Sequence, residues 1–120
     1  MTALTVACIQ MRSTITPAEN LAAASALINT AAEAGAQLIA TPEMTNLIEI
    51  RPGRSQGKVF TEDDDPTLLA LREQARGLGV WLLIGSLAIA LPDDTRKANR
   101  SFLISPNGEV VALYDKINMF

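Results

Sequence analysis

Histidine is absent from this chain of 120 residues, and cysteine occurs only once, as Cys8. Histidine is the commonest general base and metal ligand, so a Ser-His-Asp triad, a Cys-His pair and a histidine-built zinc site cannot form within the chain. A single cysteine also excludes an internal disulfide and favours a reducing compartment. Any catalysis by these residues must therefore use carboxylates, amines, hydroxyls or the one thiol.

An excess of basic residues and a long hydrophobic segment are also missing. Ten Lys and Arg stand against 13 Asp and Glu, and the sequence pI is near 4.8. This balance offers no basic surface for nucleic acid or anionic lipid. No basic segment followed by an apolar one is found near residue 1, so we expect no secretion signal. The longest apolar runs, such as 80–84, are far shorter than the roughly 20 residues that span a bilayer. We expect a soluble, cytoplasmic protein that binds neither nucleic acid nor membranes.

Strand-like and helix-like segments alternate along the sequence, which predicts an α/β layered fold in one domain, residues 1–120. Helices are expected to begin at Pro17, where Thr16 and Glu19 could form a capping box, and at Pro66, with Asp65 as the N-cap. Gly35 and Gly79 are expected to end them. The strands are expected at 4–11, 38–41, 80–90, 99–104 and 110–116.

The first predicted strand, Leu4 to Met11, is short and apolar, which suits a strand buried on both faces. Cys8 lies in its middle and is expected to be a buried structural thiol. The acidic run from Glu62 to Asp65 precedes a proline, so we interpret it as a helix cap and a solvated loop, and we expect no metal there. Dinucleotide and P-loop patterns are absent, and nothing in the sequence calls for an organic cofactor.

Two ionisable residues stand at predicted strand ends in otherwise apolar surroundings. Glu43 follows the strand at 38–41, and ligands of open α/β sheets bind beyond such carboxyl ends. Lys116 ends the last strand, where alternation places it on one face with Tyr114, Ala112 and Val110. Composition alone favours a plainer interpretation, in which both residues are solvated surface charges.

Three stretches together resemble the N-terminal half of the nitrilase, or carbon-nitrogen hydrolase, superfamily. They are VACIQM in the first strand, AAEAGAQLIATPEMTN around Glu43, and YDKINMF at 114–120. Between them, NRSFLISPNGEVVALYDKI resembles the hairpin that leads to that family's lysine. The order and spacing also fit, and the closest likeness is to the branch of ω-amidase and deaminated-glutathione amidase. The resemblance implies half of an αββα sandwich: a mixed sheet with two helices packed on one face.

The resemblance also implies a Glu-Lys-Cys catalytic triad that hydrolyses an amide, or a nitrile, of a small molecule through a thioester acyl-enzyme, without a cofactor. Glu43 matches the general base and Lys116 the residue that stabilises the oxyanion. The family's nucleophilic cysteine would follow residue 120, so this chain contains no nucleophile of the triad, and Cys8 is not a plausible substitute. Asn118 stands where the family usually has histidine.

We therefore interpret the chain as the N-terminal part of a longer hydrolase, inactive alone, whose exposed sheet face requires the C-terminal half or a homo-oligomeric partner. The alternative is a non-catalytic, flavodoxin-like α/β binding or interaction module in which Glu43 and Lys116 are surface charges. The two interpretations differ in geometry. A catalytic pair must converge on one reacting centre, whereas surface charges can point to different faces of the sheet.

Overall fold

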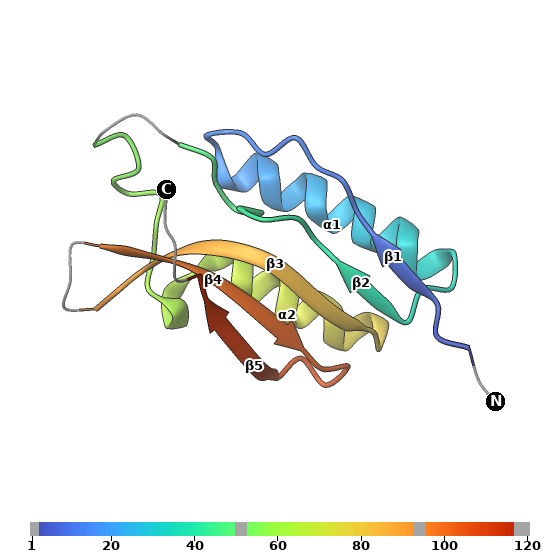
Figure 1. Ribbon diagram of the computed structural model, residues 1–120. Helices are drawn as coiled ribbons and strands as arrows, with labels where there is room; N and C mark the ends of the chain where they lie inside the picture. Colours follow the sequence, from blue (N-terminus) through green and yellow to red (C-terminus); the bar gives the residue numbers. More distant parts are fainter. Residues whose placement is uncertain (1–2, 50–52, 93–95, 117–120) are drawn as a thin grey trace.

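The computed structural model describes residues 3–49, 53–92 and 96–116 (Figure 1). The elements in chain order are β1 (Val6–Cys8), α1 (Pro17–Glu33), β2 (Leu38–Ala40), a short 3-10 helix η1 (Glu62–Asp64), α2 (Pro66–Leu78), β3 (Trp81–Ala90), β4 (Lys97–Ile104) and β5 (Val110–Asp115). Asn118 lies outside the described residues.

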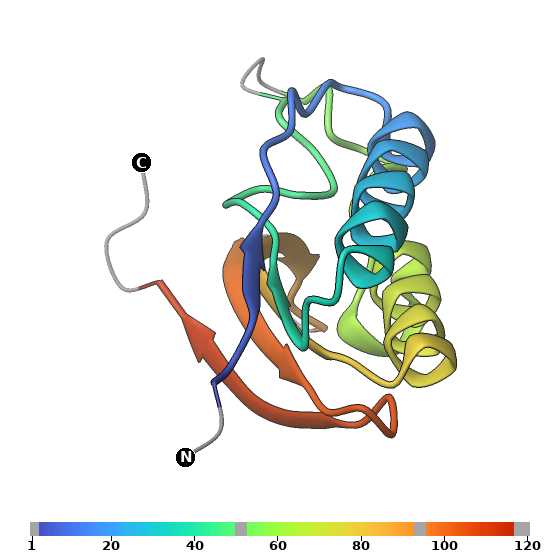
Figure 2. The ribbon, with the colours of Figure 1, turned by 90° about the vertical axis from the view of Figure 1, so that its right-hand side faces the viewer.

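The five strands form one mixed sheet in the order β1-β2-β3-β4-β5. The first three strands are parallel because α1 and α2 return the chain to the same edge, and the last three are antiparallel. Both helices lie on one side of the sheet (Figure 2). The predicted mixed α/β sheet is confirmed. The flavodoxin-like topology of the alternative is wrong, since β4 and β5 run antiparallel to their neighbours.

The hydrophobic core fills the space between the helices and the sheet. Its fully buried members come from both layers and include Ile28, Ile39, Leu68, Leu71, Leu82, Ile84, Phe102 and Ile104. Burying a side chain of this size stabilises the fold by about 1.5–3 kcal/mol relative to exposing it. The packing that stabilises the sheet therefore lies on the face that the two helices cover.

The caps of α2 follow the sequence prediction, and α1 begins at Pro17 as predicted but without its capping box. Asp65 Oδ1 accepts a hydrogen bond from the backbone N–H of Leu68 at 2.8 Å, and Gly79 ends α2 with a φ of 68°. Thr16 is the N-cap of α1 but makes no side-chain capping bond, so the predicted capping box is wrong. The Thr14 hydroxyl takes the place of the Thr16 hydroxyl: it accepts from the Thr16 N–H at 3.1 Å and donates to Glu19 at 3.5 Å.

The prediction of a first strand buried on both faces is wrong. β1 spans three residues, Val6 is 50% exposed, and the Cys8 thiol is exposed as well. Among the described residues β1 is an edge of the sheet, with β2 as its one paired strand. Apolar composition indicated a strand but could not show that one face would lack a covering layer.

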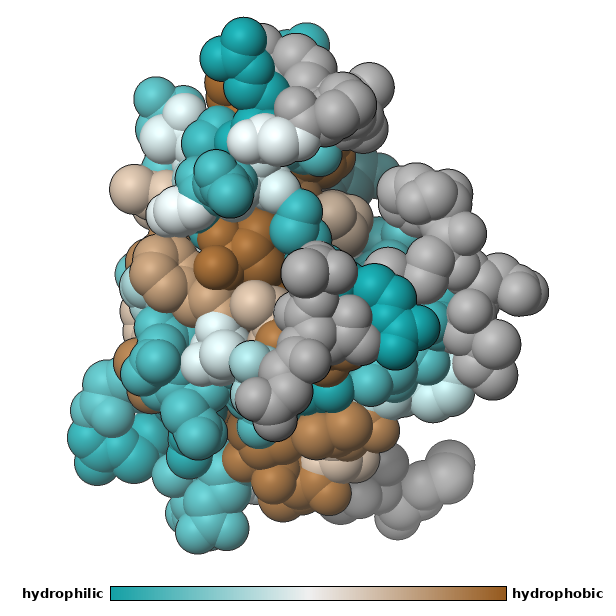
Figure 3. All heavy atoms as spheres, turned by 90° about the vertical axis from the view of Figure 1, so that its left-hand side faces the viewer, coloured by the Kyte–Doolittle hydropathy of each residue, from teal (hydrophilic) through white to brown (hydrophobic). Residues whose placement is uncertain are grey.

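The face of the sheet opposite the helices is apolar and uncovered in the part of the chain that the structure describes. Val6, Trp81 and Leu83 on this face are 39–50% exposed. Figure 2 shows no described helix or strand packed against it. Figure 3 shows further apolar side chains in brown among hydrophilic ones at the loop end of the molecule. Among the described residues, no helix is long and apolar enough to cross a membrane.

A shift in the register of β4 and β5 corrects the predicted alternation around Lys116. Leu103 pairs with Ala112, but the next residue, Ile104, pairs with Val110. The irregularity turns Val110 toward the core, where it packs against buried residues. Val110 therefore does not share the face of Ala112 and Tyr114, as alternation predicted.

Candidate active site

Glu43 lies on a tight turn that follows the carboxyl end of β2. The Thr45 hydroxyl donates to the carbonyl of Pro42 at 2.6 Å, and the backbone N–H of Met44 donates to Ser86 Oγ at 2.8 Å. Met44 adopts a φ of 55°, which is uncommon for a residue with a side chain. Such strained positions persist only where the surroundings enforce them, and here the hydrogen bonds on both sides of Glu43 do so.

Gly85 in β3 lets the strand approach this turn closely. A Cβ atom at this position would lie 2.4 Å from the carbonyl oxygen of Thr41 and 2.5 Å from that of Pro42. The register of β3 against β4 shifts at the same place, between Ile84 and Leu87. The backbone N–H of Gly85 also donates to the Thr41 hydroxyl at 3.2 Å. Glycine is therefore required here by contact, since only a hydrogen atom fits between the two backbones.

Glu43 and Lys116 converge although they are far apart in the sequence. Lys116 Nζ lies 3.3 Å from Glu43 Oε1, while the two side chains are 39% and 48% exposed. The same carboxylate oxygen accepts a hydrogen bond from Asn99 Nδ2 at 3.1 Å. The expected convergence of a carboxylate and an ammonium is therefore present. The pair is half-exposed and not enclosed by the described residues.

An ion-pair network lies beside this pair on the next residues of β4 and β5. Arg100 bonds both oxygens of Asp115, at 2.6 and 2.9 Å, and Glu62 at 3.0 Å. These hydrogen bonds from Arg100 hold the pKa of the Asp115 carboxyl below its usual range. Glu62 of the acidic run thus ties the loop to the sheet, a role that the solvated-loop interpretation missed.

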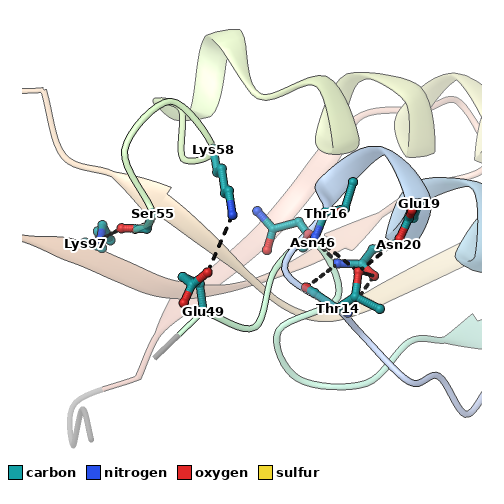
Figure 4. A network of polar contacts seen from close by, with 9 residues as sticks. All are labelled: Thr14, Thr16, Glu19, Asn20, Asn46, Glu49, Ser55, Lys58 and Lys97. Carbon is teal, nitrogen blue, oxygen red and sulfur yellow. Dashed lines mark hydrogen bonds and ion pairs between the residues drawn. The ribbon is translucent and has the colours of Figure 1, made fainter. Parts of the chain in front are cut away.

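Polar side chains also fix the long segment after Glu43 (Figure 4). Buried Asn20 accepts from the Thr14 N–H at 2.8 Å and donates to the carbonyl of Asn46 at 2.9 Å. Further along, the Glu49 carboxylate, only 1% exposed, pairs with Lys58 at 3.5 Å. Ser55 contacts Lys97 of β4. The segment is therefore attached to α1 and β4 by specific contacts.

Asp65 is a second buried carboxylate in this region, at 1% exposure. Burial raises the pKa of Asp65 above its usual value, although hydrogen bonds from Leu68, Thr67 and Asn46 act in the opposite direction. Its neighbours in the acidic run do not gather around a common centre. The described residues contain no group of three or more Cys, Asp and Glu side chains that could hold a metal ion.

Comparisons with known proteins assign the chain to a family. A sequence model described as carbon-nitrogen hydrolase matches residues 5–120. The chain belongs to the carbon-nitrogen hydrolase family. A deaminated glutathione amidase from Yersinia enterocolitica is 34% identical over 87 residues, which cover 72% of this chain and 30% of that protein.

Solved structures support the same assignment for the fold of this hydrolase chain. The NitFhit protein of C. elegans superimposes with a TM-score of 0.87 at 26% identity, over 98% of this chain and 30% of that one. An amidase from Nesterenkonia sp. gives 0.80 at 28% identity, over 98% of this chain and 44% of that one. The chain thus spans less than half the length of these relatives.

The exposed Cys8 of this carbon-nitrogen hydrolase chain lies far from Lys116. Strand register places Cys8 opposite Ala40, Leu83, Leu103 and Ala112 in turn, so β1 and β5 stand at opposite edges of the sheet. On the side of the carboxylate, Cys8 pairs with Ala40, three residues before Glu43, so about 10 Å of chain separates the two positions. The thiol is therefore exposed but too far from Glu43 for direct proton transfer, and the reason for excluding it is this distance rather than burial.

Sequence reasoning singled out Glu43 and Lys116 and missed Asn99, Gly85 and Ser86. Asn99 carried no distinct signal, because it opens the predicted strand at 99–104 next to the equally polar Arg100 and Ser101. Gly85 carried a weak signal, because glycine within a strand often marks a bulge or a close backbone approach. This signal names no partner, so only the structure connects these residues to Glu43.

Proposed function

We propose that this chain supplies the carboxylate and the ammonium of a Glu-Lys-Cys triad that hydrolyses the carbon-nitrogen bond of a small-molecule amide. The observation that carries the proposal is the approach of Lys116 Nζ to within 3.3 Å of Glu43 Oε1. Two oppositely charged groups on one side of a shared centre are what a general base and an oxyanion donor need.

The chemistry follows from the two groups. Glu43 takes the proton of a cysteine thiol while the sulfur forms a bond to the amide carbon, and the Lys116 ammonium stabilises the oxyanion of the tetrahedral intermediate. The intermediate then expels ammonia, which receives the proton from Glu43 as the carbon-nitrogen bond breaks. A water molecule, deprotonated by Glu43, hydrolyses the resulting thioester and the thiol is regenerated.

The nucleophile in this proposal comes from outside the 120 residues, because Cys8 is remote from the pair. A solved structure of a Nesterenkonia amidase variant has the acetamide moiety of fluoroacetamide attached to its active site cysteine, which supports a cysteine in the same role here. The uncovered apolar sheet face gives a place for the polypeptide that brings this cysteine. That polypeptide would be a C-terminal half or a second protein chain.

A chimera tests the proposal directly. Residues 5–120 would replace the matched N-terminal part of the Nesterenkonia amidase, and ammonia release would be measured with butyramide, which a variant of that amidase binds. We expect turnover by the chimera and none by the 120-residue chain alone. Glu43→Gln and Lys116→Met should each reduce kcat/KM by at least about 100-fold, the loss expected when one general-base or oxyanion group is removed.

Two control substitutions test whether a loss of turnover reflects the roles of Glu43 and Lys116 or the removal of any surface charge. Glu109→Gln lies in the exposed hairpin between β4 and β5, and Arg76→Met lies on the exposed side of α2. Both should leave turnover within a few-fold of the parent chimera. Turnover that survives Glu43→Gln or Lys116→Met would refute the assigned roles. Turnover by the chain alone that is lost in Cys8→Ala would show that the exposed thiol is the nucleophile after all.

A further inference from the structure

Asn99 is the buried member of the group around Glu43. Its side chain is 5% exposed, whereas those of Glu43 and Lys116 are about half-exposed. An exposed ion pair is worth little and orders its long side chains weakly. The hydrogen bond from Asn99 Nδ2 to Glu43 Oε1 comes instead from a short side chain on a paired strand. The amide is therefore the fixed point against which the carboxylate can be oriented.

The same residue also holds Lys116 through its backbone. The carbonyl oxygen of Asn99 accepts a hydrogen bond from the backbone N–H of Lys116 at 2.9 Å, directly beyond the last residue of β5. Asn99 thus bonds Glu43 with its side chain and Lys116 with its main chain. The two bonds set the position of Lys116 relative to Glu43 from a single residue.

Asn99 is held from the other side by its place in the sheet. It pairs with Ala88 of β3. The side chain of Asn46 bonds both backbone groups of Ala88, accepting at 2.9 Å and donating at 3.1 Å. Asn46 is 1% exposed, and its carbonyl in turn accepts from Asn20 of α1. Hydrogen bonds therefore tie the strand position opposite Asn99 to α1.

The orientation of the Asn99 amide is fixed by Glu43. No donor among the described residues reaches Asn99 Oδ1, which is buried. Turning the amide over would face this oxygen toward the carboxylate and remove the one hydrogen bond that the side chain makes. The amide nitrogen is thus directed at Glu43, and the carboxylate is its single described partner.

From these contacts we infer that Asn99 is a positioning residue that aligns Glu43 with Lys116 for the proposed amide hydrolysis. The catalytic part of the inference, that this alignment serves amide hydrolysis, rests on the proposed function. Its structural part, the alignment of the carboxylate by the amide, can be measured without any turnover.

The first experiment uses the intact 120-residue chain and nuclear magnetic resonance. Three-bond Hα–Hβ couplings report whether the Glu43 side chain occupies one rotamer or several, and hydrogen exchange reports the backbone bond of Lys116. We expect one dominant Glu43 rotamer in the unsubstituted chain. Asn99→Ala and the isosteric Asn99→Asp should both give averaged rotamers. The Asn99→Ala variant should keep the protection of the Lys116 N–H within about twofold, because the bonded carbonyl is retained.

A matched control keeps this result specific. Asn107→Ala removes an amide side chain from the exposed turn after β4 and should leave the Glu43 couplings unchanged. A single Glu43 rotamer in Asn99→Ala would overturn the inference. Loss of Lys116 protection together with rotamer averaging would also overturn it, since Asn99 would then be a structural residue of the strand.

The second experiment measures kinetics in the chimera. Asn99→Ala and Asn99→Asp should lower kcat by roughly 10–100-fold with KM within about threefold, as expected for a displaced catalytic group. Averaged Glu43 rotamers with unchanged kcat would overturn the catalytic part of the inference, because turnover would then not need the alignment, while Glu43→Gln tests the proposed function separately. Unchanged rotamers with normal kcat would refute the alignment and leave the proposed function intact.

Discussion

Replacing Gly85 with alanine tests whether the turn that bears Glu43 depends on close backbone contact. The new Cβ would lie 2.4–2.5 Å from backbone atoms of Thr41 and Pro42. Carbon contacts are favourable only near 3.5–4 Å, so one backbone must move by about 1 Å. Overpacking of this kind costs roughly 1–3 kcal/mol, and the lower entropy of the unfolded alanine chain offsets about 0.4–1 kcal/mol. We expect a net loss of roughly 1–2 kcal/mol.

Urea denaturation followed by circular dichroism measures this loss, with Gly77→Ala as the control. Gly77 lies in α2, and a Cβ there meets nothing within 4 Å. Alanine at that position should stabilise the chain by about 0.5–1 kcal/mol, because it favours the helix. If Gly85→Ala proves as stable as the unsubstituted chain, the turn does not need the contact. The reasoning from Cβ distances would then be refuted.

Three further predictions follow from the polar contacts and the exposed thiol. Burial raises the pKa of Asp65, so its carboxyl group binds a proton more tightly in the folded chain than in the unfolded chain. The free energy of unfolding should therefore fall as pH rises from about 3.8 through the pKa of the folded state. In urea titrations at several pH values, Asp65→Asn should reduce this dependence of stability on pH. Arg100→Lys should cost about 1 kcal/mol in the same assay, because lysine cannot bond both Asp115 and Glu62, and an unchanged stability in low salt would contradict this. Cys8 should react with a disulfide reagent in the native chain at a rate close to that in urea, and strong native protection would contradict its exposure.

Local signals in the sequence predicted the helices and turns well. Asp65 before Pro66 and Gly79 predicted both ends of α2, where Asp65 caps the first turn and Gly79 has a φ of 68°. These features depend on short-range chemistry, such as caps and positive φ, which the sequence displays directly. Bounds of β2, β4 and β5 were also close to those observed.

Features that depend on distant neighbours were harder to predict. The exposure of Cys8 follows from the edge position of β1, which no local pattern encodes. The irregularities at Ile84/Leu87 and Leu103/Ile104 reverse the alternation of faces, so a period-two rule misplaced Val110. Glu43 and Lys116 were identified by resemblance, whereas Asn99 makes its contact across 56 residues of sequence and had no motif to indicate it.

The ion pair between Glu43 and Lys116 joins residues 73 positions apart, across both halves of the mixed sheet. It can form only after the parallel strands have paired through their helical connections and β5 has been added to β4. Contacts of such long sequence separation form late because the entropy of closing the intervening loops opposes them. The chain therefore assembles its charged pair only when the whole sheet is in register. Any partly folded state without the last strand would hold an isolated carboxylate and no complete site.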